Sequence, residues 1–159
     1  MTETSPSGYS LTQIILHWIT AVAVITAFVT HDAMVLIATD VREAGGAPFP
    51  TIHTLAGLIA FVAIVIRLLL RRRHGAPEAQ GSELNQTLAK LGHWALYTLV
   101  IIVPLMGAVS WFGGVENLSM PHGILGKALM LLALGHAVMA IWHQFVKKDG
   151  TLLRMLKPK

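Results

Sequence analysis

The sequence predicts an all-α membrane protein, a four-helix transmembrane bundle with both termini in the cytoplasm. Three observations support this fold. The 159-residue chain is 54% hydrophobic and only 13% charged, whereas a soluble domain normally has about a quarter charged residues. Its mean hydropathy is +0.63. Four stretches have the roughly 20 apolar residues that a spanning helix needs, and they lie at residues 11–31, 51–70, 91–112 and 121–146.

The first two stretches have recognisable ends. Residues 1–10 are polar and contain no lysine or arginine, unlike the basic start of a signal peptide. We therefore expect a retained membrane anchor whose helix begins near Ser10 or Thr12. Residues 40–50 contain glycines and prolines and cannot be helical throughout. The second stretch opens at Thr51 and stops at a run of three arginines.

The last two stretches follow a polar linker at residues 74–83. Pro104 and Gly107 predict a kink in the third helix, because proline cannot donate the helical hydrogen bond. Pro121 suits the first turn of the fourth helix. The four spans and their connections account for the whole chain, so we expect residues 1–159 to form a single transmembrane domain.

The basic residues predict the orientation. Ten of the twelve lie on one side of the bundle: Arg67, Arg71, Arg72, Arg73, Lys90, Lys147, Lys148, Arg154, Lys157 and Lys159. The connections on the other side carry four acidic residues and one arginine: Asp32, Asp40, Arg42, Glu43 and Glu116. The basic side of a membrane protein faces the cytoplasm. This distribution indicates contact with anionic lipid and not with nucleic acid.

Histidines give the strongest functional signal. Several recur at intervals of 14 residues, as His17 does with His31 and His122 with His136. Fourteen residues is nearly four helical turns, so each pair shares one helix face with about 21 Å between its members. Imidazoles are costly in lipid and usually mark a function there. Two sets at two depths predict two haem groups, one near each membrane face.

The type of haem and its ligands can be narrowed further. The chain has no cysteine, which excludes disulfides, iron–sulfur clusters and covalent haem attachment, so any haem is b-type. A six-coordinate haem needs two facing neutral imidazoles. Counted from the outer face of the membrane, His53 lies at the same depth as His122, and His17 lies at the same depth as His136. Spacing does not exclude other histidines at these depths as haem ligands. They are His31 in the outer set, and His93 and His143 in the inner set.

Two glycines repeat beside the outer histidines. Gly57 follows His53 by four residues, and Gly126 follows His122 by four residues. A glycine one turn from a ligand leaves space for a flat macrocycle against the backbone. Small residues also let membrane helices approach closely, so either role explains the pattern.

Several motifs together resemble the bacterial cytochrome b561 family over residues 9–155. They are LHW at His17, IHTLAG at His53, LGHW at His93, LGHAVMAIWH at His136 to His143, and the tail KKDGTLLRM. The resemblance implies a bacterial inner-membrane protein in which four helices hold two b haems. It implies His17 with His136 as ligands on the cytoplasmic side, and His53 with His122 on the periplasmic side.

Two cations are candidates for roles beside the haems. Arg67 follows His53 by 14 residues and lies at the inner end of the same helix face. It could pair with a propionate of the inner haem, and the family has an arginine at the matching position; the alternative is snorkelling to the headgroups. Lys127 lies in the fourth helix, where a lone lysine is costly. We expect it either to face the outer haem edge and attract an anion, or to snorkel.

The remaining inner histidines predict a quinone site. His93 and His143 could transfer protons, which quinone reduction consumes together with electrons. Trp94 or Trp142 could contribute to the same pocket, although all four residues could instead be interfacial.

The favoured function is an oxidoreductase that moves electrons from a small periplasmic donor to ubiquinone. The resemblance implies superoxide as a donor that is oxidised to oxygen. The alternative is a haem-bearing anchor that relays electrons for a separate redox partner protein. A histidine-lined metal transporter is disfavoured because no intramembrane carboxylates accompany the histidines.

Overall fold

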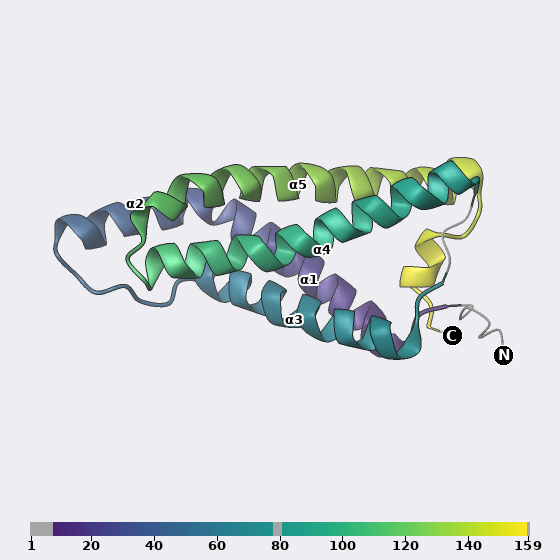
Figure 1. The fold of residues 1–159 in the computed structure, drawn as a ribbon, viewed down its shortest axis with the longest axis horizontal. Coiled ribbons are helices and arrows are strands. Elements are labelled where there is room, and N and C mark those ends of the chain that lie inside the picture. Colours follow the sequence, from purple (N-terminus) through teal and green to yellow (C-terminus); the bar gives the residue numbers. More distant parts are fainter. Residues whose placement is uncertain (1–7, 78–80, 159) are drawn as a thin grey trace.

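A computed structural model of the chain describes residues 8–77 and 81–158, and the described residues form helices without a strand (Figure 1). Most of the expected leading polar segment, residues 1–7, and part of the expected linker, residues 78–80, lie outside the described residues. The longer helices are α1 (Leu11–Val29), α2 (His31–Glu43), α3 (Ile52–His74), α4 (Glu83–Trp111) and α5 (Ser119–Trp142). The short elements are η1 (Glu116–Leu118), a π-helical turn η2 (His143–Lys147) and η3 (Leu152–Met155).

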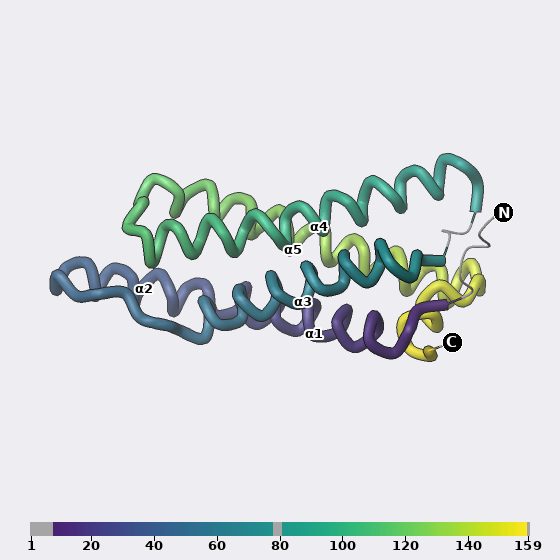
Figure 2. The backbone as a smooth tube through the Cα atoms, turned by 60° about the horizontal axis from the view of Figure 1, so that its bottom comes forward, coloured from purple at the N-terminus to yellow at the C-terminus, as the bar shows by residue number. Residues whose placement is uncertain are grey.

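The helices form two layers. α1 packs mainly against α3, and α5 mainly against α4, as Figure 2 shows from the side. We name the two ends of the bundle by the elements that lie there. α2 projects beyond one end, the α2 end, and η3 lies at the opposite end, the η3 end (Figure 1). At the η3 end the indole of Trp18 donates a hydrogen bond to the carbonyl of Met155 at 2.9 Å, which ties η3 to α1.

Four segments are long and apolar enough to cross a membrane, which confirms the expected fold class: Leu11–Val29, Ile52–His74, Glu83–Trp111 and Glu116–Lys147. The helix surfaces agree with this, because many large apolar side chains point outward, such as Leu131 with 73% of its surface exposed. In lipid such side chains face the acyl chains at no cost. The buried centre is small and joins both layers; it comprises Ala23, Ala60, Ile64, Tyr97, Val100 and Leu129.

Local sequence explains where the helices begin. Ser10 caps α1 in a capping box with Gln13, as expected from the sequence. Thr51 caps α3 in the same way with Thr54. α4 begins eight residues before the expected 91, because Ser82 accepts a hydrogen bond from the Asn85 amide and starts the helix in the polar segment.

The expected first span, residues 11–31, is divided at Thr30. The hydroxyl of Thr30 donates to the carbonyl of Thr26 at 2.7 Å, a back-bond that bends helices. The chain then continues as α2, which reaches Glu43 before the loop. In α4 the helix continues without a break through Pro104 to Trp111.

Candidate functional site

Six of the histidines form two clusters, one at each end of the bundle. The α2-end cluster comprises His31, His53 and His122, and the η3-end cluster comprises His17, His93 and His136. α5 contributes one histidine to each cluster, and the others come from the facing helices. The fold therefore brings together residues that lie far apart in the sequence, at two depths.

In the α2-end cluster, the ring centres of His53 and His122 are 5.9 Å apart, and those of His31 and His53 are 6.1 Å apart. When two histidines bind one iron from opposite sides, each nitrogen is about 2 Å from the metal, so the ring centres are about 6 Å apart. Both spacings suit ligation. The distance alone therefore does not exclude His31 as the second ligand in place of His122.

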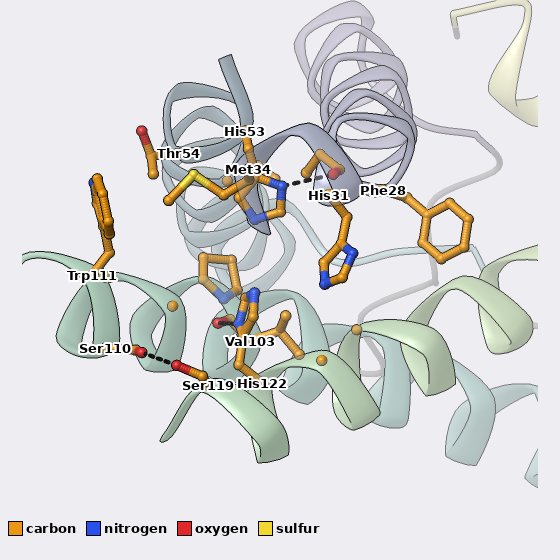
Figure 3. Close-up of a pocket in the computed structure, with 18 of the residues that line it drawn as sticks. Phe28, His31, Met34, His53, Thr54, Val103, Ser110, Trp111, Ser119 and His122 are labelled. Carbon is orange, nitrogen blue, oxygen red and sulfur yellow. Dashed lines mark hydrogen bonds between the residues drawn. The ribbon is translucent and has the colours of Figure 1, made fainter. Parts of the chain in front are cut away.

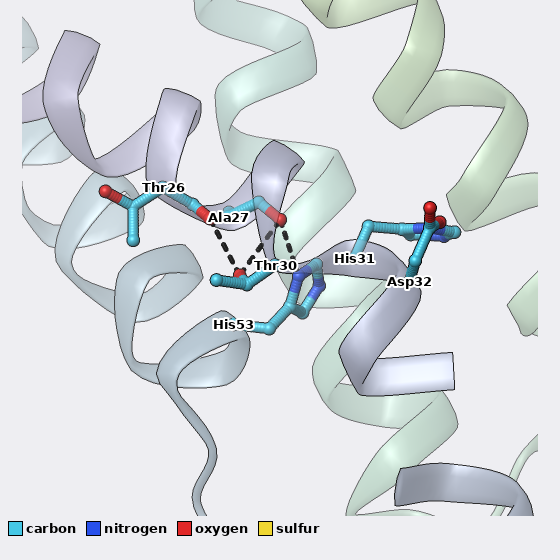
Figure 4. A network of polar contacts seen from close by, with 6 residues as sticks. All are labelled: Thr26, Ala27, Thr30, His31, Asp32 and His53. Carbon is cyan, nitrogen blue, oxygen red and sulfur yellow. Dashed lines mark hydrogen bonds and ion pairs between the residues drawn. The ribbon is translucent and has the colours of Figure 1, made fainter. Parts of the chain in front are cut away.

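Hydrogen bonds orient the rings of His53 and His122, the two outer histidines that lie at the same depth. The Nδ1 of His53 donates to the carbonyl of Ala27 at 2.8 Å, in the last turn of α1 (Figure 4). The Nδ1 of His122 donates to the carbonyl of Val103 at 2.9 Å. A carbonyl only accepts, so in each neutral ring the proton lies on Nδ1 and the Nε2 lone pair is free. This is the tautomer that a metal-binding histidine requires.

A cavity of about 1120 Å³ surrounds these rings and is lined by residues of all five long helices. Figure 3 shows His31, His53 and His122 together among the lining side chains. Small-molecule sites typically occupy roughly 300–1,000 Å³ and are mostly apolar. The α2 end therefore has the ring spacing, the tautomers and the space that a b-type haem needs.

Four glycines line this cavity, and Gly57, Gly126 and Gly107 differ in what they allow. A Cβ on Gly57 would lie 3.7 Å from Pro104, and a Cβ on Gly126 would lie 4.0 Å from Val103, both ordinary contacts. Protein packing alone does not demand glycine at these two positions. A Cβ on Gly107 would lie 2.7 Å from Cε1 of His122, so this glycine is required for the ring to occupy its place.

Replacing Gly107 with alanine should displace the His122 ring and remove the haem of the α2 end, because the added methyl group overlaps the imidazole. The haem content of the purified chain, measured as the pyridine haemochrome, reports the loss. Gly92→Ala is the matched control in α4, since nothing lies within 4 Å of a Cβ there. Unchanged haem content in Gly107→Ala would remove His122 from the ligand set.

The η3-end cluster has two different spacings. The ring centres of His17 and His136 are 6.2 Å apart, close to the separation of about 6 Å for two ligands of one iron. The rings of His93 and His136 are 5.2 Å apart, and the Nδ1 of His93 donates to the carbonyl of Ala89 at 2.6 Å. The geometry favours His17 with His136 and leaves His93 beside the pair.

Arg67 lies next to this pair and is buried, with 7% of its surface exposed. Its Nη1 donates to the Nδ1 of His17 at 2.7 Å, and its Nη2 lies 4.0 Å from the sulfur of Met155. Its guanidinium carbon is 6.0 Å from the ring centre of Tyr9. Within residues 8–77 and 81–158 no carboxylate pairs with Arg67. A buried cation without an anion is unfavourable, so the site suits a negatively charged group.

The contact between Arg67 and His17 also fixes a tautomer. A guanidinium only donates, so the Nδ1 of His17 accepts and the proton of the neutral ring lies on Nε2. For Nε2 to bind iron, Arg67 must turn to another acceptor and Nδ1 must take the proton. A carboxylate such as a haem propionate is an acceptor of the required kind.

The other candidates lie further out. Lys127 lines the cavity and is exposed. Trp94 and Trp142 are 58% and 49% exposed, as interfacial tryptophans are.

His143 is not in the η3-end cluster; its Nδ1 donates to Asp149 at 2.5 Å. Sequence patterns did not single out Asp149, because nothing in the spacing of a tail residue indicates which ring it contacts.

Comparison with known proteins identifies the family of the chain. The model of the prokaryotic cytochrome b561 family matches residues 8–158. The chain belongs to this family. A cytochrome b562 of Cereibacter sphaeroides is 35% identical, with 98% of this chain and 99% of that protein covered. No solved structure matches the chain.

Two other relatives are more distant. A probable superoxide oxidase CybB of Yersinia pestis is 29% identical, with 95% of this chain and 97% of that protein covered. The cytochrome b561 homolog 2 of Escherichia coli is 26% identical, with 96% and 93% covered. Membership of the cytochrome b561 family means that this chain is a multi-pass protein of the bacterial inner membrane that binds haem and serves electron transfer.

Proposed function

We propose that this cytochrome b561 protein binds two b haems and moves electrons from a small periplasmic donor to ubiquinone in the membrane. The observation that carries the proposal is the presence of two facing imidazole pairs at opposite ends of one bundle, with ring centres 5.9 and 6.2 Å apart. His122 and His136 are 14 residues apart on α5, which is about 21 Å along the helix. The pairs thus span most of a hydrocarbon core of about 30 Å.

The residues around the pairs have distinct tasks in this proposal. His53 and His122 bind one iron, and His17 and His136 bind the other. Haem b supplies one-electron redox chemistry at each pair. Arg67 neutralises a propionate at the η3 end, while Gly57 and Gly126 let the macrocycle approach the backbone at the α2 end.

The distribution of charge supports an orientation with the η3 end in the cytoplasm. Arg71, Arg72 and Arg73 end α3, and Lys147, Lys148 and Arg154 follow α5 at the same end. On α2 and η1, Arg42 pairs with Glu116 at 3.3 Å, which leaves the acidic residues of α2 in excess. The positive-inside rule then directs the α2 end to the periplasm.

The Yersinia pestis relative is a probable superoxide oxidase, which supports superoxide as the donor. Oxidation of superoxide to oxygen releases one electron, so two superoxide anions reduce one quinone. The test is to mix the purified, haem-loaded chain with superoxide and a ubiquinone analogue, and to record oxygen release and quinol formation together. We expect two oxygen molecules per quinol. Haem reduction only by a protein donor, and never by superoxide, would instead indicate a relay subunit for a redox partner.

Lys127→Gln should slow haem reduction by superoxide several-fold at low ionic strength, because it removes a positive charge from the cavity wall. Added salt should reduce the difference between the variant and the parent protein. Stopped-flow haem reduction measures both. Lys157→Gln is the control, because Lys157 is an exposed lysine of the tail. If the Lys127 variant and the parent protein are reduced by superoxide at the same rate, Lys127 does not attract the donor and only snorkels to the membrane surface.

A further inference from the structure

The end of α5 folds a carboxylate back onto His143. After Trp142 the chain makes the π-helical turn η2, and Lys148 then adopts a left-handed conformation with φ 55°. This reversal brings the backbone N–H of Asp149 to the carbonyl of His143, at 3.3 Å. The side chain of Asp149 accepts a hydrogen bond from the Nδ1 of His143 at 2.5 Å. π-Helical turns within helices occur frequently at functional sites.

Thr151 holds the same carboxylate from its other side. The second oxygen of Asp149 accepts from the Thr151 amide at 3.0 Å and from the Thr151 hydroxyl at 2.6 Å. Partial burial acts to raise the pKa of Asp149, but the hydrogen bonds from Thr151 and His143 outweigh it and lower that pKa to about 2. Asp149 is therefore a fixed negative charge at physiological pH.

The surroundings of this carboxylate are basic. Asp149 is the sole acidic residue after Glu116 in the sequence. The charged and titratable groups on the elements that contact η2 are otherwise basic: Lys147, Lys148, Arg154 of η3, and His136 two turns back on α5. The side chains of His143 and Asp149 are 21% and 17% exposed, so their contact is only partly screened by water.

We propose that Asp149 is the positioning residue that keeps His143 oriented as the proton donor to the quinone at the η3 end. This inference rests on the function proposed above. His143 follows His136 by seven residues, which puts it on the same helix face about 10 Å nearer the η3 end. With Nδ1 bonded to Asp149, Nε2 is the nitrogen left to face a substrate.

The reaction balances as follows. The quinone accepts two electrons, which come from the periplasmic donor, and two protons, which come from the cytoplasm. For one of the protons, the Nε2–H bond of His143 breaks as an O–H bond forms on a quinone carbonyl oxygen. The neutral ring then takes a proton from water, and Asp149 remains a carboxylate throughout.

The pH profile of quinol formation tests the inference. In Asp149→Asn, the rate of quinol formation should fall about tenfold, with the greatest loss at high pH, because the ring is no longer held with Nε2 toward the quinone. Asp149→Glu should restore the profile, because it keeps the charge. Reduction of the haems by the donor should not change. Glu83→Gln is the matched control, since it removes an exposed carboxylate from the start of α4. An Asp149→Asn profile that superimposes on that of the parent protein overturns the inference.

A second measurement does not depend on turnover or on haem retention. Diethyl pyrocarbonate modifies neutral imidazoles, and mass spectrometry of the peptide that carries His143 follows its rate against pH. Asp149→Asn should change the rate at which this peptide is modified, because the ring loses the carboxylate that holds Nδ1. Equal reactivity in the two proteins overturns the inference. If the parent protein reduces no quinone with any donor, the proposed function fails, and the modification experiment still decides whether Asp149 controls His143.

Discussion

Replacing His53 with alanine is expected to lower the haem content of the purified chain from about two per polypeptide to about one. The ring of His53 lies 5.9 Å from that of His122, and its Nδ1 is bonded to the carbonyl of Ala27. Without this ring the haem would lack one of the two imidazoles that would hold it, and no cysteine can hold it covalently. The pyridine haemochrome gives the content, and the reduced-minus-oxidised spectrum identifies the haem that remains.

His31→Ala is the informative companion to this variant. His31 lies 6.1 Å from His53, lines the same cavity, and bonds Asp32 through Nδ1 at 3.0 Å. We expect His31→Ala to retain both haems, because His122 is opposite His53 on α5. Loss of a haem in His31→Ala with retention in His53→Ala would move the ligand to the start of α2.

Arg67→Gln should weaken retention of the haem at the η3 end by roughly 2–5 kcal/mol, the usual cost of removing one partner of a buried charge pair. The reason is that the glutamine leaves a propionate without its cation. Transfer of haem to apomyoglobin measures retention. The reduction potential of the same haem should also fall, because a nearby positive charge favours the reduced form.

The control for this variant is Arg72→Gln, an exposed arginine five residues further along α3. The haem-free chain provides a second comparison. There the cation of Arg67 is buried without an anion, so Arg67→Gln should leave the stability of the haem-free chain unchanged or raise it. A large loss of stability in the haem-free variant, with normal haem retention in the loaded one, would show that Arg67 serves packing alone.

The sequence was informative wherever a pattern repeats along one helix. Hydropathy predicted the four spans, and intervals of 14 residues placed His122 and His136 at opposite ends of one helix face. Contacts between helices were harder to predict. Gly107 was expected to mark a kink, and its close approach to the ring of His122 depends on how α4 and α5 pack.

Irregular backbone limited prediction in two other places. Thr30 interrupts the first stretch, yet hydropathy continues through it, so α2 was not separated from α1. The contact between Asp149 and His143 requires both a π-helical turn and a left-handed residue at Lys148, and neither has a spacing that a sequence displays. The residues of the imidazole pairs could thus be proposed in advance, whereas the groups that orient them could not.

The place of α5 has a consequence for biogenesis. This helix supplies His122 and His136 to the two pairs, yet Leu129 is the one residue within its length that is buried. α5 packs mainly against α4, and in the proposed function ligation through His122 to α3 and through His136 to α1 would also attach it to the other layer. A chain inserted in a haem-starved cell would lack these links between its two layers, which would make it easier for membrane proteases to extract. The abundance of this cytochrome should accordingly follow the supply of haem, with degradation as the means of control.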